Sequence, residues 1–307
     1  MNQGIIDIGS NTIRLNVYKI EEKKFALLFS KKESVGLVSY VKKRVMTEEG
    51  IEILANCLNS FIEMMHSLNI HSFSAFATAS LRNIDNTLDV IEKIKKRCHV
   101  SIDLLSGAQE GRISFIGAIH GLRSQQGMYV DTGGASSEII LYENREIGYV
   151  TSLPVGSLNL FNKYVDRILP TKDEYAQMKE AVLKELKETG KDRNFFRCKT
   201  MAIAGGSMRA IRSVFVALRW MTSDEYEISE KLLNSLEEYL FEDRVRTAHL
   251  LLKVKPDRVH TLLCGLAIIQ TLLHYTKAQV IQVSANGVRE GYLIDKVIGG
   301  KYGRQEI

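Results

Sequence analysis

The spacing of apolar and polar positions changes several times along the chain, beginning near the N-terminus. Residues 5–8 are apolar except for Asp7, a pattern that predicts a strand buried on both faces. In residues 13–18 apolar and polar positions alternate, which predicts a half-buried strand. The small polar turn 9–12 joins the two. A turn between two strands excludes the Walker A loop and the dinucleotide-binding loop, because both of those lead into a helix.

Residues 46–122 continue as alternating helices and strands. Apolar residues recur at helical spacing after Thr47, a candidate N-cap that is followed by two acidic residues. The same criteria predict helices at 46–68, 86–98 and 107–122, and strands at 72–80 and 100–106. Strands that alternate with helices indicate an α/β domain.

The opening pattern then occurs a second time. An apolar strand ends near Asp131, a turn of small residues occupies 133–137, and a second strand follows. Two strand, aspartate, turn and strand units more than a hundred residues apart indicate two domains built on the same plan.

The second half contains further helices and strands. Thr171 and Glu174 form a capping box, so we expect a helix to begin there. The remaining predictions are a strand, glycine turn and helix around 200–214, an apolar central helix at 260–275, a buried strand at 278–284, and a last helix at 288–298 that stops at Gly299 and Gly300.

Composition limits the class of protein. The chain has 307 residues, 45% of them hydrophobic, and no apolar run near the roughly 20 residues that span a bilayer. We expect no leader peptide, a cytoplasmic location and no contact with a membrane. The four cysteines are widely separated, so we expect reduced, mostly buried thiols and no zinc site. A net charge of +5 favours polyanions, but without a nucleic-acid-binding motif we expect no nucleic acid partner.

Three turns rich in glycine and serine are candidate phosphate-binding loops. Successive backbone N–H groups in such a turn can point into one concavity and bind phosphate oxygens, and glycine allows the backbone to approach a ligand closely. One such turn alone is better explained as an ordinary loop, whereas three favour phosphate binding. The residues are Gly9, Ser10, Asn11, Thr12, Gly133, Gly134, Ala135, Ser136, Gly205, Gly206 and Ser207.

Acidic residues near these turns are candidate ligands for Mg²⁺. Asp7, Asp131 and Glu138 fit that role because Mg²⁺ takes one or two carboxylates together with water and phosphate oxygens. The alternative is that the two aspartates only accept hydrogen bonds from turn amides. Glu110 lies in the first turn of a predicted helix, where an acidic side chain also stabilises the helix dipole.

Six segments in order connect the chain to a known family. With "DIGSNTIRL", "ATASLR", "LLSGAQEGR", "DTGGASSE", "AGGSMRAI" and "SANGVREG", the sequence resembles the Ppx/GppA family of exopolyphosphatases and guanosine pentaphosphate phosphohydrolases over essentially its whole length. The resemblance implies an α/β fold of two ribonuclease-H-like domains of the actin, sugar kinase and heat-shock ATPase superfamily, facing each other across a cleft. The expected domains are 1–124 with 288–307, and 125–287.

The resemblance also implies roles for individual residues. Glu110 matches the proposed general base, Arg82 matches an arginine that faces the phosphate chain, and Asp131 and Glu138 match acids tied to Mg²⁺. The glycine turns match the phosphate loops. Dimers are common in the family, so we expect a homodimer.

The chain departs from the family pattern at several places. Gln109 replaces the first acid of a Glu-Glu pair, Ala285 replaces an aspartate, and an arginine usual near residues 33–41 is absent. Longer members append a further helical region, so we expect a shorter channel for polymer here, or one completed by a dimer.

The expected activity is Mg²⁺-dependent hydrolysis of the terminal phosphoanhydride of inorganic polyphosphate. Three alternatives remain open at this point. They are hydrolysis of guanosine pentaphosphate, transfer of the terminal phosphoryl group to a nucleoside diphosphate, and sensing of such an anion without turnover.

Overall fold

The computed structural model describes residues 1–22 and 24–299, and these form two compact units. The first contains Met1–Glu110 and the described residues from Tyr292 onward, and the second is Gly111–Gly291. Residues 111–124 and 288–291, which we expected in the first domain, therefore belong to the second unit. Each unit is described by itself below.

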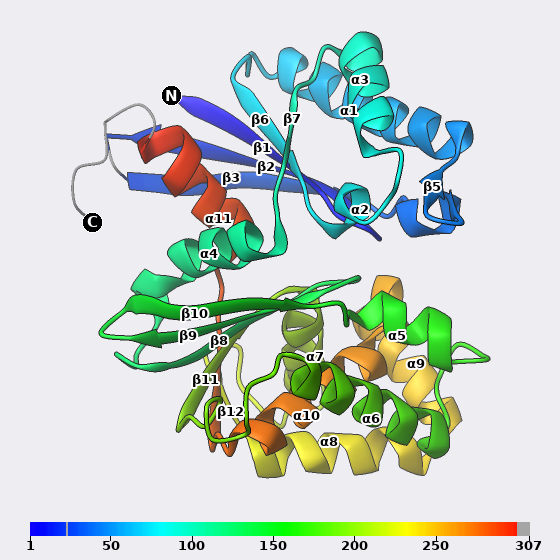
Figure 1. Cartoon of the computed structure of the whole chain (residues 1–307), viewed down its shortest axis with the longest axis vertical. Coiled ribbons are helices and arrows are strands. Elements are labelled where there is room, and N and C mark those ends of the chain that lie inside the picture. The colour runs from blue at the N-terminus through cyan, green and yellow to red at the C-terminus, as the bar shows by residue number, and fades with distance from the viewer. Residues whose placement is uncertain (23, 300–307) are drawn as a thin grey trace. The chain divides into compact units, whose positions relative to one another are not determined.

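The first unit contains a five-stranded sheet in the order β3-β2-β1-β6-β7 (Figure 1). β1, β2 and β3 form an antiparallel meander, and β6 and β7 then add in parallel to β1. The strands are β1 (Asn2–Ile8), β2 (Ile13–Glu21), β3 (Lys24–Glu33), β6 (Phe73–Ala77) and β7 (Ile102–Leu104). The predicted strands on both sides of the first turn are thus confirmed.

Helices cover this sheet and bury its apolar residues. Leu54 and Phe61 of α1 and Ile94 of α3 pack into one core with Ile6 and Ile8 of β1. The helices are α1 (Glu48–Ser67), α2 (Ala79–Arg82), α3 (Thr87–Cys98) and the start of α4 (Gly107–Ala118). Short elements also occur, namely η1 (Leu37–Tyr40), β4 (Val41–Lys42) and β5 (Val45–Met46).

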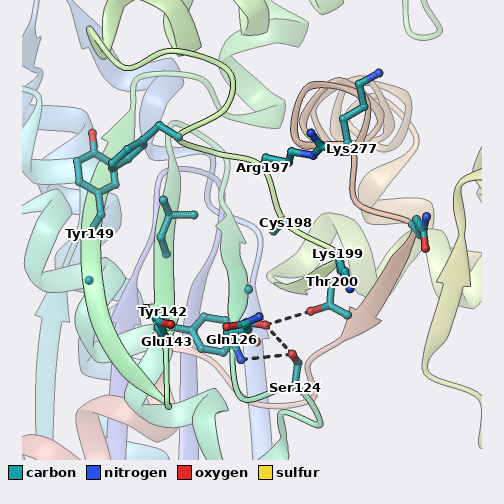
Figure 2. Close-up of a pocket in the computed structure, with 15 residues that line it drawn as sticks. Ser124, Gln126, Tyr142, Glu143, Tyr149, Arg197, Cys198, Lys199, Thr200 and Lys277 are labelled. Carbon is teal, nitrogen blue, oxygen red and sulfur yellow. Dashed lines mark hydrogen bonds between the residues drawn. The ribbon is translucent and has the colours of Figure 1, made fainter.

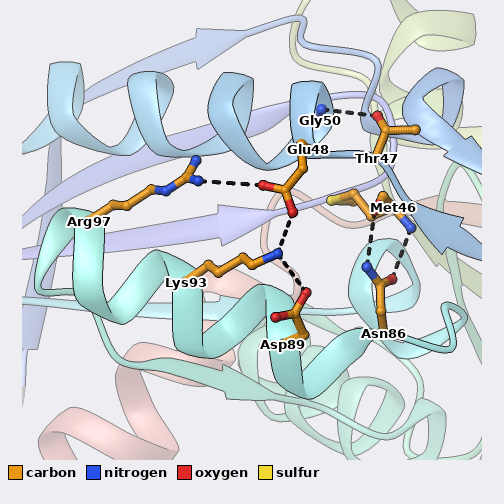
Figure 3. A network of polar contacts seen from close by, with 8 residues as sticks. All are labelled: Met46, Thr47, Glu48, Gly50, Asn86, Asp89, Lys93 and Arg97. Carbon is orange, nitrogen blue, oxygen red and sulfur yellow. Dashed lines mark hydrogen bonds and ion pairs between the residues drawn. The ribbon is translucent and has the colours of Figure 1, made fainter.

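Polar contacts align the ends of α1 and α3 (Figure 3). The carboxylate of Glu48 pairs with the ammonium group of Lys93 and lies 3.5 Å from Nη2 of Arg97. The side-chain amide of Asn86 bonds both backbone groups of Met46, at 2.9 and 3.0 Å. Because the ion pairs are exposed they contribute little stability, so the buried core holds the helices and these contacts orient them.

The second unit repeats the sheet plan. Its strand order is β10-β9-β8-β11-β13-β12, with an antiparallel meander β8, β9 and β10 followed by β11 and β13 in parallel. The strands are β8 (Gly127–Thr132), β9 (Ser137–Glu143), β10 (Glu146–Leu153), β11 (Thr200–Ala204), β12 (Glu227–Ser229) and β13 (Val280–Val283). Only β12, an added antiparallel edge strand, has no counterpart in the first sheet.

A nearly all-buried helix forms the centre of the second unit. Almost every residue of α10 is buried, and it contacts α5, α6, α7 and α8 (Figure 1). The helices of this unit are η2 (Ile119–Gly121), α5 (Ser157–Tyr164), α6 (Lys172–Glu188), α7 (Gly206–Ala217), α8 (Glu230–Glu242), α9 (Arg244–Val254), η3 (Pro256–Arg258) and α10 (Leu262–Thr276). The predicted central helix and the capping box of Thr171 with Glu174 are both confirmed.

The chain returns to the first unit at its end. α11 (Val288–Tyr292) continues into the π-helical turn η4 (Leu293–Ile298). The ring of Tyr292 stacks on Phe76 of β6, and its hydroxyl bonds the carboxylate of Asp103. The element ends at Ile298 with Gly299 as its C-cap, which agrees with the predicted end, and Gly300 lies outside the described residues.

Candidate functional site

The first glycine turn closes the hairpin of β1 and β2. The amide of Gly9 donates to the carbonyl of Thr12 at 3.1 Å, and the segment after β3 supports the turn through Gly36 N to Asn11 O (2.9 Å) and Val38 N to Ser10 O (3.1 Å). Within residues 1–22 and 24–299, the amides of residues 10–12 donate no backbone hydrogen bond. The carbonyl groups of the turn are thus bonded to the segment after β3, while three successive N–H groups remain available to a ligand.

The second glycine turn has the same geometry. The amide of Gly133 donates to the carbonyl of Ser136 at 2.9 Å, and the following amides of residues 134–136 donate no backbone hydrogen bond to the described part of the chain. The N-terminal residues of α5 support this turn, because Leu158 N donates to Gly134 O at 2.8 Å and the side-chain Nδ2 of Asn159 donates to Ala135 O at 2.8 Å. Both loops therefore use their carbonyl groups for anchorage.

The duplication extends to the acids before each turn. Asp7 and Asp131 each lie two positions before the first glycine of their turn. In β1 and β2 the cross-strand partner of Asp7 is Arg14, whereas in β8 and β9 the partner of Asp131 is Glu138. The first unit thus places a cation beside its aspartate, and the second places another carboxylate there.

Asp131 and Glu138 form the candidate metal centre. Directly opposite residues on antiparallel strands share a face, and two like charges there are destabilising unless a cation lies between or beside them. Serine hydroxyls orient both carboxylates, with Ser114 Oγ donating to Asp131 and Ser152 Oγ donating to Glu138 at 2.8 Å. Asp131 is half-buried, and Glu138 is 1% exposed. This donor set fits a hard divalent cation that keeps most of its water ligands.

No cluster of three or more His, Cys, Asp or Glu side chains suited to holding a metal occurs among the described residues. The two opposed carboxylates alone, completed by water and substrate oxygens, are a common arrangement for Mg²⁺. Asp7, the third predicted ligand, belongs to the first unit, whereas Asp131 and Glu138 belong to the second.

A buried polar network lies behind Asp131. The hydroxyls of Ser114 and Tyr129 lie 2.7 Å apart, and the Tyr129 hydroxyl is also 3.2 Å from the carbonyl of Ser114. Burial raises the pKa of Tyr129 well above its usual value, and the charge of Asp131 raises it further, so Tyr129 stays protonated. Burial lowers the pKa of Arg209, and the nearby cation of Arg289 lowers it further. The negative charges of Asp131 and Glu290 oppose this shift.

The third glycine turn packs directly on the second loop. Gly205 has φ 95°, and a Cβ atom there would lie 2.4 Å from the carbonyl oxygen of Thr132 and 3.0 Å from Oδ1 of Asp131. Only glycine fits this contact and this backbone angle. The turn also starts α7, whose first turn has neither an acidic residue nor a side-chain cap. The N–H groups at this helix end therefore favour an anion.

Arg258 adds a positive charge to the third turn. A Cβ atom at Gly206 would lie 2.4 Å from Nη2 of Arg258, so the guanidinium rests on the turn backbone. Burial lowers the pKa of Arg258, although the carboxylate of Asp257, 3.7 Å away, opposes that shift. Nearby, the buried hydroxyls of Ser207 and Thr132 have no hydrogen-bond partner within the described part of the chain. Such groups call for a water molecule or a ligand oxygen.

Arg82 and Glu110 form an ion pair within the first unit. Nη1 of Arg82 lies 2.9 Å from Oε2 of Glu110 and 2.8 Å from the carbonyl oxygen of Leu105. Both side chains are mostly buried, at 18% and 13% exposed. The general base and the phosphate-facing arginine implied by the resemblance are therefore direct neighbours.

The structure also explains one departure from the family pattern. Gln109 forms a capping box with Ser106: the amide of Ser106 donates to Oε1 of Gln109 at 2.9 Å, and the amide of Gln109 donates to the hydroxyl of Ser106 at 3.2 Å. Glutamine serves this role as well as glutamate does. The substitution thus keeps the start of α4 and removes only a charge.

The model of the Ppx/GppA phosphatase family matches residues 16–298. The chain belongs to this family. A putative exopolyphosphatase of Haemophilus influenzae is 22% identical over 291 residues, which cover 94% of this chain and 89% of that protein. Exopolyphosphatase 1 of Mycobacterium tuberculosis is 26% identical over 192 residues, which cover 61% of this chain and 56% of that protein.

Solved structures of Ppx/GppA proteins share the fold. An exopolyphosphatase from Cytophaga hutchinsonii has a TM-score of 0.86 at 21% identity, covering 98% of each chain. The Aquifex aeolicus family member has a TM-score of 0.78 at 22% identity, covering 98% of this chain and 99% of that one. The expected α/β fold with one large sheet in each of two units and the membership of a family of phosphoanhydride hydrolases are confirmed.

Several site residues were not predicted from the sequence. Ser114, Tyr129, Arg209 and Arg258 all surround the second and third turns. Arg209 could have been identified from the sequence. A cation near the N-terminus of a helix is unfavourable to the helix dipole, so its presence there indicates an interaction with an anionic group. Arg258 follows a proline in an irregular segment, where no sequence pattern indicated its role. Among residues 1–22 and 24–299, no helix combines the length and the apolar composition needed to span a bilayer.

Proposed function

We propose that this chain hydrolyses the terminal phosphoanhydride bond of inorganic polyphosphate with Mg²⁺ and releases orthophosphate. The observation that carries the proposal is the pair of equivalent loops at Gly9 and Gly133. Each is closed by the same hydrogen bond, and each has three amides that donate none to the backbone of the described residues. The names of the relatives, which are exopolyphosphatases, support the choice of substrate.

The three loops bind phosphate oxygens in this proposal. The amides of residues 10–12 and 134–136 and the N-terminus of α7 supply neutral donors, while Arg82 and Arg258 supply positive charge. A guanidinium has five N–H donors, so Arg82 is able to hold Glu110 and phosphate oxygens together. Phosphoryl transfer depends mainly on such positioning and charge neutralisation.

Asp131 and Glu138 would hold Mg²⁺. The opposed carboxylates and their serine donors support this assignment, and Asp7 is a third candidate ligand. When bound, the metal neutralises and polarises phosphate oxygens.

Glu110 is the proposed general base. The water oxygen bonds to the terminal phosphorus, the bridging P–O bond breaks, Glu110 accepts a proton from the water, and the shortened chain leaves with the electron pair of the broken bond. Arg82 holds the carboxylate of Glu110 in place through the contact at 2.9 Å. A general base contributes about 10²–10⁴-fold to the rate.

Phosphate release tests the proposal. Long-chain polyphosphate and guanosine pentaphosphate are incubated in parallel with Mg²⁺ and the native protein or Glu110→Gln. Release from polyphosphate that falls about 10²–10⁴-fold in the variant supports the proposal. Release from the nucleotide alone would identify a guanosine pentaphosphate phosphohydrolase, and release only with an added nucleoside diphosphate would identify a transferase. Binding of either without turnover would identify a sensor.

The cytoplasmic location and the homodimer stay predictions. Sedimentation of the native protein measures its oligomeric state and so tests the homodimer.

A further inference from the structure

A pocket lies within the second unit, at the opposite end of the sheet from the second and third phosphate loops. It has a volume of about 830 Å³ and includes Gly127 at the start of β8 and Thr200 at the start of β11. The second and third loops follow the other ends of these two strands. The six residues of β8 separate the pocket from the second loop by roughly 20 Å at about 3.3 Å per residue.

Three cations line this pocket on one side. They are Arg197 and Lys199 on one segment and Lys277 on another, all labelled in Figure 2. Two backbone hydrogen bonds bring them together, because Cys198 N donates to Thr276 O and the amide of residue 279 donates to Lys199 O, both at 3.1 Å. The backbone segments that carry the three cations are therefore adjacent and joined by hydrogen bonds.

The loop that carries Arg197 and Lys199 is firmly anchored. Phe196 is fully buried, and the guanidinium of Arg193 donates to the carbonyl of Tyr275 at 2.8 Å and to that of His274 at 2.6 Å. Such anchorage lowers the entropy cost of ligand binding, because the backbone is already ordered.

The charges of the pocket are not balanced. Arg197, Lys199 and Lys277 have no side-chain hydrogen bond or ion pair with any part of the chain that the structure describes. Glu143 is the one acidic residue that lines the pocket, so its lining carries three positive charges and one negative charge, a net charge of +2. Exposed cations on a surface are usually only solvated. Here all three line one concave volume of the size that ligands occupy.

Aromatic rings form the wall across from the cations. Tyr149 lies on the other side of the pocket in Figure 2, and its ring meets Phe195 edge to face at 5.0 Å between centroids. Phe195 remains 40% exposed. The ammonium group of Lys191 lies 5.0 Å from the Phe195 centroid and 5.9 Å from that of Tyr149, so a base would stack on the exposed part of Phe195 that Lys191 leaves uncovered.

We propose that this pocket binds an anion with a chain of phosphate groups, either free or as part of a nucleotide, at a site separate from the three loops. Arg197, Lys199 and Lys277 contact the phosphates, and the Tyr149 and Phe195 wall contacts a base where the ligand has one. The site does not depend on the hydrolysis proposed above.

Lysine footprinting tests the site directly. The native protein is acetylated without divalent metal, with and without tripolyphosphate, and labelling is measured by mass spectrometry. Lys199 and Lys277 should be labelled several-fold more slowly with the anion. Lys187, Lys231 and Lys253, exposed lysines of the same unit that do not line the pocket, should be unaffected. Equal labelling of Lys199 and Lys277 with and without tripolyphosphate and guanosine triphosphate would overturn the proposal.

Matched variants add a binding measurement. The triple variant Arg197→Gln, Lys199→Gln and Lys277→Gln removes the same charge as the control Lys187→Gln, Lys231→Gln and Lys253→Gln. By calorimetry, one tripolyphosphate-binding event should weaken by at least roughly tenfold in the first variant only. Identical binding by the two variants would contradict the proposal.

A final variant distinguishes the two sources of phosphate. If the native ligand is a nucleotide, Phe195→Ala should weaken the binding of guanosine triphosphate and leave the binding of tripolyphosphate unchanged. Equal binding of guanosine triphosphate by Phe195→Ala and the native protein would support an inorganic ligand. A protein that hydrolyses nothing but still shows protection of Lys199 and Lys277 would disprove the proposed function and leave this site intact.

Discussion

Nη1 of Arg82 lies 2.9 Å from Oε2 of Glu110, so the residue matched to phosphate binding and the residue matched to water activation share one ion pair. Arg82 ends the short helix α2, and Glu110 lies in the first turn of α4. The carbonyl oxygen of Leu105 also accepts from the same nitrogen of Arg82 at 2.8 Å. The pair therefore links the orientation of the base to the arginine.

Loss of Arg82 should reduce catalysis more than substrate affinity. Arg82→Ala is expected to lower kcat by ~10²–10³-fold, as removal of a donor to a developing charge does. Arg82→Lys should recover part of this loss, because it restores charge without the planar fork. Steady-state kinetics with polyphosphate measures both. A double variant Arg82→Ala, Glu110→Gln that loses the product of the two single effects would contradict coupling through the ion pair.

Ser114 should control metal affinity through Asp131. Its hydroxyl donates to the Asp131 carboxylate and contacts the Tyr129 hydroxyl. Ser114→Ala is expected to weaken Mg²⁺ or Mn²⁺ binding by about 10–100-fold, a usual effect of losing a partner of a metal ligand. Calorimetric titration of the metal without substrate measures this. Ser213→Ala is the control, since among the described residues that hydroxyl bonds the Arg209 carbonyl alone. An equal effect there would refute the assignment.

Gly205 should tolerate no side chain. Gly205→Ala places Cβ 2.4 Å from the Thr132 carbonyl at φ 95°, whereas Gly190→Ala, at φ 71°, has nothing within 4 Å of its Cβ. Both changes cost about 1 kcal/mol or more for the backbone angle. Only the first adds a clash, so its free energy of unfolding in urea should fall further and its phosphate release should be lost. Equal stability of the two variants would contradict this packing.

Stability should fall in mild acid partly because of His260. Burial lowers the pKa of His260, the charge of Arg258 lowers it further, and that of Asp257 opposes the shift. Below about pH 6.5 the unfolded chain then binds more protons at this position than the folded protein does, so the free energy of unfolding decreases as the pH falls. Urea unfolding at pH 7.5 and 5.5 should show a smaller decrease for His260→Gln. An unchanged decrease would rule His260 out.

Gln109 should stabilise the start of α4 through its hydrogen bonds with Ser106, so the charge of the side chain at this position should have little effect on stability. Gln109→Glu preserves the capping box with Ser106, so the free energy of unfolding should change by less than about 0.5 kcal/mol. Gln109→Ala should cost ~0.5–1 kcal/mol. Thermal unfolding measures the stability of both variants. An equal loss of stability in Gln109→Glu and Gln109→Ala would show that the capping box contributes nothing.

Local patterns were sufficient for most elements. The strands around both turns, the helices that follow Thr47 and Thr171, and the apolar helix α10 all depend on spacing and capping within one segment. The duplicated plan was visible for the same reason. The third strand of each meander was missed because β3 is an edge strand with exposed residues on both faces, so its sequence lacks the alternation of a half-buried strand.

Contacts between distant segments required the folded chain. Arg82 contacts Glu110, which lies 28 residues later in the sequence. Arg258 contacts the turn at Gly206, which lies 52 residues earlier. Side chains this far apart meet only once the sheets and helices have packed, so no local pattern indicates their partners. Spacing along the chain was enough to identify the loops and the acids beside them, while packing selected the arginines and hydroxyls that surround them.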